Sequence, residues 1–153
     1  MIDAATDSFV LRLRDLGLNG EACDEWTVRD LEQQLRVELP PAYKAFLAVA
    51  GNGWEPLEGS HYAIEDDLAD LQRSGQRIMK HDGAKLPDDA FVFRVHQGYA
   101  FNFFLAQDGE DPPVYEYVEG MPPVQRVAAR LTDWLAEALS RFRALRERRA
   151  SGA

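Results

Sequence analysis

Apolar residues between positions 31 and 53 recur at helical spacing, and the other segments of the chain are best interpreted as what packs against this stretch. The recurring side chains, at i, i+3, i+4 and i+7, are Tyr43, Phe46, Leu47 and Ala50. Such a stripe is typical of a buried helix face. Pro40 and Pro41 mark the start of the helix, because proline is accepted in the first helical turn. Residues 51–53, Gly-Asn-Gly, mark its end.

Four other segments also have helical patterns. The segment before Pro40 predicts a short helix with Thr27 as its N-cap, and its apolar face holds Val28, Leu31 and Leu35. Residues 8–16 and 65–80 predict two more amphipathic helices, the second with Leu68, Leu71 and Ile78 facing inward. From residue 124 onward the spacing predicts one long C-terminal helix that crosses the core.

Between the last two helices, apolar and polar residues alternate with the period of a β-strand. Residues 90–95 and 99–105 predict a hairpin in which Phe91, Phe93 and Val95 share a face with Tyr99, Phe101, Phe103 and Leu105. Residues 114–118 predict a third strand, and residues 60–64 predict a short one. The chain therefore predicts an α+β fold: a mostly antiparallel sheet, a meander of about residues 90–118, covered by N-terminal helices and a long C-terminal helix.

The central stretch also resembles a known signature. It is similar to the N-terminal motif of the SUKH superfamily. The matching residues are Glu32-x-x-Leu35, then Leu39-Pro40-x-x-Tyr43-Lys44-x-Phe46-Leu47, and then the helix end at Gly51 to Gly53. Gly98-Tyr99 and Pro113-Val114-Tyr115 resemble the central sheet of the same superfamily, so the match covers about residues 27–118. Arg36 departs from the pattern, since many members have glycine there, and we expect it to end its helix without the left-handed conformation.

The resemblance implies a single SUKH-like domain over residues 1–153. The superfamily includes a yeast cell-wall assembly regulator and many bacterial immunity proteins. It therefore implies a non-catalytic, protein-binding domain that neutralises a cognate toxin, often a nuclease, by direct binding. The alternative is a regulatory or scaffold module that binds host proteins.

Charge narrows the class of partner. The 153 residues carry a formal net charge of −9, which disfavours nucleic acid as a ligand and favours a basic protein. Cys23 is the only cysteine, so no internal disulfide forms. The N-terminus lacks an apolar signal segment, and no apolar run approaches the ~20 residues that span a bilayer. We therefore expect a cytoplasmic protein.

The acidic residues are unevenly distributed. Residues 124–153 hold seven arginines and three acids, so the remaining chain has ten basic and 23 acidic residues. Residues 55–70 and 108–119 hold acids and no lysine or arginine. The alternative to a binding role is that these segments are solvated loops. With two aromatic residues as anchors, they predict one surface for a basic partner. Its candidate residues are Trp54, Glu55, Glu58, Tyr62, Glu65, Asp66, Asp67, Asp70, Asp108, Glu110 and Asp111.

Residues that carry catalytic or metal chemistry are sparse. The three histidines, His61, His81 and His96, are far apart and have no metal-ligand spacing. Cys23 has no histidine near it in the sequence, which favours an incidental thiol over a nucleophile. We therefore expect no catalytic residue, no metal and no cofactor.

Overall fold

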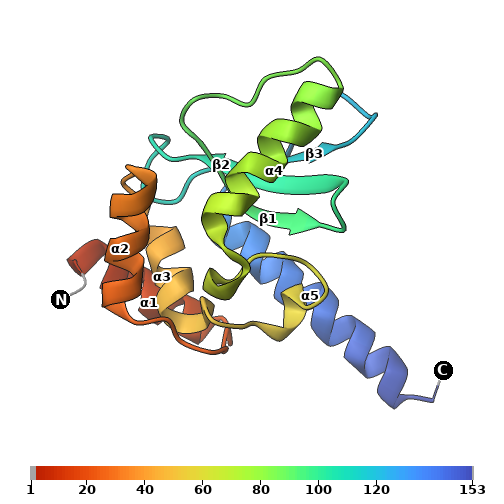
Figure 1. Ribbon diagram of the computed structural model, residues 1–153. Helices are drawn as coiled ribbons and strands as arrows, with labels where there is room; N and C mark the ends of the chain where they lie inside the picture. The colour runs from red at the N-terminus through yellow and green to blue at the C-terminus, as the bar shows by residue number, and fades with distance from the viewer. Residues whose placement is uncertain (1–2, 153) are drawn as a thin grey trace.

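The computed structural model describes residues 3–152 (Figure 1). The helices are α1 (Ala4–Asp15), α2 (Glu25–Leu35), α3 (Pro41–Ala50), α4 (Leu68–His81) and α5 (Leu131–Ala150), with short 3-10 turns η1 (Glu55–Leu57) and η2 (Ile64–Asp66). The strands are β1 (Ala90–His96), β2 (Ala100–Leu105), β3 (Val114–Val118) and β4 (Gln125–Ala128). The strands form one antiparallel sheet in the order β1-β2-β3-β4. The predicted α+β fold with an antiparallel meander is confirmed.

Helices cover both faces of the sheet. On one face, the ring of Tyr43 in α3 lies 5.3 Å from that of Phe91 and 5.2 Å from that of Phe104. Trp134 of α5 contacts Phe93 on the same face, at 5.1 Å. α4 packs on the other face, and in Figure 1 the sheet lies between α4 and α5. Strands β1 and β2 are thus buried on both sides, which explains why they carry apolar residues on both faces.

The predicted face shared by the hairpin was wrong in part. A bulge between Val92 and Arg94 shifts the register of β1 against β2, and such a bulge changes which residues face which side. Phe91 and Phe93 face α3 and α5, whereas Val92 lies with Phe101 beneath Gly75 of α4. A Cβ on Gly75 would stand 2.7 Å from a methyl carbon of Val92. Glycine therefore allows α4 to approach the sheet closely.

The fourth strand was not where the pattern placed it. Residues 60–64 make only an isolated bridge, from His61 to Val95. The fourth strand is β4, which the sequence pattern had assigned to the start of the long helix. Val124, Val127 and Leu131 fit helical spacing, yet α5 begins only at Leu131, after the exposed edge strand. An edge strand with one covered face needs few apolar residues, so it left little signal.

Helix starts are set by aspartates that the pattern did not single out. Asp3 caps α1, which begins at Ala4 and is longer than the predicted 8–16. Asp24 caps α2 by accepting a 2.8 Å hydrogen bond from the Thr27 backbone N–H, so Thr27 is not the N-cap. The C-cap of α2 corrects a second expectation. Arg36 does adopt the left-handed conformation, with φ 51° and ψ 47°, although its side chain makes that conformation costly.

Candidate functional site

The two aromatic residues predicted as interface anchors lie in the core. Trp54 is 2% exposed and Tyr62 is 6% exposed. They bind each other: the Trp54 backbone N–H donates to the Tyr62 hydroxyl at 2.6 Å, and that hydroxyl donates to the Trp54 carbonyl at 3.0 Å. This placement corrects the expectation that they offer aromatic contacts to a partner, because neither side chain reaches the surface.

Several of the predicted acids have local structural partners. The carboxylate of Asp66 accepts hydrogen bonds from the backbone N–H groups of Tyr62 and Ala63 at 3.1 and 3.0 Å. Asp67 is the N-cap of α4, and its side chain accepts from the Asp70 backbone N–H. Asp70 itself forms an exposed ion pair with Arg73. Asp66 and Asp67 therefore stabilise the turn into α4 whatever else they bind.

The second acidic segment lies elsewhere. The carbonyl of Glu110 accepts from the Ala42 backbone N–H at the first turn of α3, and Asp111 accepts from the backbone N–H of Thr132 at the start of α5. The first segment contacts the opposite end of α3, where Ile64 donates to the Gly51 carbonyl. α3 has ten residues, which corresponds to about 15 Å. The two segments therefore contact opposite ends of α3.

Other acids join the first segment instead. Glu21 and Gly53 form an antiparallel bridge beside the C-terminal end of α3, and the next residues lead directly into α2. Burial raises the pKa of Tyr62, and the carboxylates of Glu58, Asp66 and Glu21 raise it further. These carboxylates therefore lie near one hydroxyl. We call Glu21, Glu58 and Asp66 the acidic end of the molecule.

Four predicted acids remain exposed without a side-chain hydrogen bond or ion pair among residues 3–152: Glu58, Glu65, Asp108 and Glu110. Glu55 differs, since its carboxylate lies 3.8 Å from the guanidinium of Arg146 on α5. Glu58 is part of the acidic end, and Glu65 directly precedes Asp66 of that end in the sequence. Asp108 and Glu110 belong to the β2–β3 loop. The unpaired carboxylates are the ones whose charge is most available to a partner.

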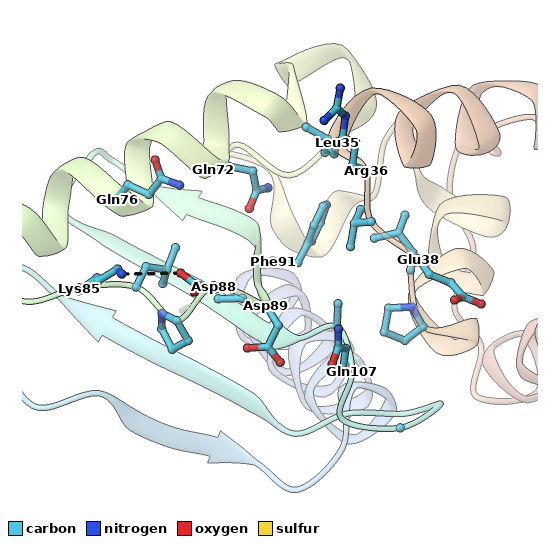
Figure 2. Close-up of a pocket in the computed structure, with 18 of the residues that line it drawn as sticks. Leu35, Arg36, Glu38, Gln72, Gln76, Lys85, Asp88, Asp89, Phe91 and Gln107 are labelled. Atoms are coloured by element: carbon cyan, nitrogen blue, oxygen red, sulfur yellow. Dashed lines mark ion pairs between the residues drawn. The ribbon is translucent and has the colours of Figure 1, made fainter.

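A groove of about 1110 Å³ is a prominent concavity of the described residues. It lies between the α2–α3 connection, α4, the segment before β1 and the β2–β3 loop (Figure 2). Phe91 lies at its centre, and Leu35, Leu39 and Leu86 add apolar area. Its charged lining residues are balanced in sign: Arg36, Lys80 and Lys85 against Glu38, Asp88 and Asp89. The groove offers apolar surface with a mixed rim, which suits contact with a protein.

Groups suited to catalysis or metal binding are dispersed. Within residues 3–152, no three His, Cys, Asp or Glu side chains gather where they could hold a metal ion. Cys23 is buried, and burial raises the pKa of its thiol. His61 lies 3.4 Å from Asp66, and His81 lies 3.9 Å from Glu119. Over the same residues, no helix combines the length and the apolar character needed to cross a membrane.

Comparison with known families identifies the fold. Residues 22–137 match the SMI1 / KNR4 family (SUKH-1). The chain belongs to this family. The matched segment includes α2 to β4, the groove and most of the acidic end. SUKH domains are in general non-catalytic immunity or regulatory domains, and membership is compatible with toxin immunity. No curated protein matched the chain.

Proposed function

We propose that this chain is an immunity protein that neutralises a cognate bacterial toxin by binding it directly. The observation that carries the proposal is its membership of the SMI1 / KNR4 family (SUKH-1) over residues 22–137. The mode of action that follows is occupancy: the protein covers the surface by which the toxin acts, and it needs no chemistry of its own.

Charge supports a basic toxin as the partner. The net charge of −9 attracts cationic surfaces and speeds their encounter. A nuclease carries such a surface, because it must hold backbone phosphates with lysine and arginine. A nuclease toxin is therefore the class of partner that the charge favours.

Co-expression tests the proposal. The toxin domain encoded beside this gene is expressed in a sensitive host, alone and together with this protein. We expect survival only in the presence of this protein, and no rescue by a SUKH domain from an unrelated locus. If the gene has no toxin neighbour, or if co-expression gives no protection, the regulatory or scaffold alternative replaces this proposal.

A further inference from the structure

Trp26, in the first turn of α2, is the most exposed large hydrophobic side chain in residues 3–152. Its side chain is 82% exposed, against 69% for Met121 and 63% for Leu11. The other two tryptophans differ: Trp54 is in the core, and Trp134 packs on Phe93. An indole has a large apolar surface, and tryptophan is among the residues most enriched at the energetic centres of protein interfaces.

The position of Trp26 follows from the helix itself. Val28 and Leu31 are buried, and Leu35 packs against the core. At 100° per residue these three centre on one side of α2, and Trp26 falls almost directly opposite. Asp30 lies one turn further on the same outward face, and it is exposed. The indole therefore projects away from the body of the protein.

The surroundings of Trp26 are acidic. Asp24 immediately precedes the helix, and the chain reaches it from Glu21 at the acidic end. Arg29 is the only base within α2, and it forms an ion pair with Glu25 at 2.9 Å. A partner approaching Trp26 therefore meets a field of negative charge, which a basic surface complements.

We propose that the outward face of α2, with Trp26 at its centre, is where the basic toxin docks. This inference rests on the proposed function and names its contact surface. The Trp26 indole enters an apolar pocket of the toxin, while Asp24 at the start of α2 and Asp30 attract the surrounding basic residues. The two contributions separate kinetically, because charge acts on the encounter and desolvated contact area holds the formed complex.

Binding kinetics of single variants test the docking surface. The probe is the purified toxin domain encoded beside this gene, and surface plasmon resonance gives both rate constants at two salt concentrations. We expect Trp26→Ala to speed dissociation at least about tenfold. Asp30→Lys should slow association at low salt, and the difference should shrink as salt rises. Melting curves confirm that each variant is folded.

Two matched controls make the result specific. Met121→Ala removes another highly exposed side chain, from the β3–β4 connection. Glu147→Lys makes the same charge reversal at an exposed position of α5. We expect both controls to bind as wild type. If Trp26→Ala and Asp30→Lys bind as wild type while wild type binds the toxin, the docking surface is wrong and the proposed function stands. If wild type itself does not bind the toxin domain, the proposed function fails, and the inference fails with it.

Discussion

The side-chain amide of Gln72 takes the place of a neighbouring strand beside Val92. Its nitrogen donates to the Val92 carbonyl and its oxygen accepts from the Val92 N–H, both at 2.7 Å. β1 is an edge strand of the sheet, and an uncovered edge pairs readily with other chains. α4 therefore contributes a single side chain that both anchors the helix to the sheet and closes the sheet edge along the groove.

Gln72→Ala should destabilise the protein by about 1–3 kcal/mol, because it leaves two backbone groups of Val92 without partners. Urea unfolding measures the loss. Gln76→Ala is the control, since Gln76 is exposed one turn further along α4, and its effect should stay within about 0.5 kcal/mol. Equal unfolding midpoints for the two variants would show that the amide contributes nothing to the edge.

Phe46→Ala should cost roughly 3–5 kcal/mol. Phe46 is 2% exposed, and its ring lies 5.6 Å from that of Trp54 and 6.3 Å from that of Tyr43. A loss of this size is a large share of the stability of an ordinary domain. Thermal melting of Phe46→Ala and of Phe142→Ala, a partly exposed site on α5, makes the comparison. A melting temperature of Phe46→Ala close to wild type would contradict the burial of Phe46 beside Trp54.

Arg36→Gly should stabilise the protein by about 0.5–1 kcal/mol. Arg36 holds φ at 51°, where a side chain is strained and glycine is not. Gln34→Gly is the control, because it places glycine within the same helix at ordinary helical angles. There the substitution should destabilise by up to about 1 kcal/mol. Denaturant unfolding gives the sign of the stability change for each variant. Destabilisation by both variants would contradict the left-handed C-cap.

Asp82 should make stability depend on acid pH. The Tyr117 hydroxyl donates to its carboxylate at 2.6 Å and the Gly120 N–H donates at 2.7 Å. These bonds lower the pKa of Asp82 from 3.8. Because the pKa of Asp82 is lower in the folded protein, its ionised carboxylate stabilises the fold at pH values above its unfolded-state pKa. This stabilisation is lost as the pH falls through its folded-state pKa.

The variant Asp82→Asn should therefore be less stable than wild type near neutral pH, with the difference shrinking below about pH 4. Urea unfolding midpoints of both proteins, at about four pH values between 2 and 7, measure this difference. Asp88→Asn is the control, because the Asp88 side chain is 95% exposed. A wild-type advantage over Asp82→Asn that stays constant with pH would contradict the shifted pKa.

Tyr117 should make stability depend on alkaline pH. The hydrogen bond to Asp82, followed by burial, raises the pKa of Tyr117 to about 12. The protonated Tyr117 hydroxyl should stabilise the protein fully below about pH 10, and this stabilisation should be lost as the pH rises through the folded-state pKa of Tyr117. Tyr117→Phe removes this dependence, and urea midpoints at alkaline pH measure it. An equal loss of stability at alkaline pH in wild type and Tyr117→Phe would contradict the raised pKa of Tyr117.

Local signals predicted the elements that depend on local residues. α3 begins at Pro41 and ends at Ala50, because Pro40 precedes it, Pro41 suits its first turn and Gly51 follows it. The β1–β2 hairpin was found because its residues alternate. The start of α5 was misplaced in part because a contact there is non-local: the Thr132 N–H donates to Asp111, 21 residues earlier in the sequence. No local pattern contains such a contact.

The candidate site was less accessible to sequence reasoning. Trp54 borders an acidic segment in the sequence, yet it is buried because the segment folds back so that the Tyr62 hydroxyl reaches the Trp54 backbone. Trp26 was missed, although a signal existed. The stripe of Val28, Leu31 and Leu35 already places Trp26 on the opposite side of α2. Which acidic segments share a surface depends on contacts at the two ends of α3, which only the fold reveals.

The most direct test of the immunity proposal is a titration of toxin activity. The purified toxin domain encoded beside this gene is incubated with rising amounts of this protein, and its activity on its own substrate is measured. Direct neutralisation predicts that activity falls linearly and ends near one equivalent. Toxin activity that is unchanged at a large excess of this protein would contradict the account.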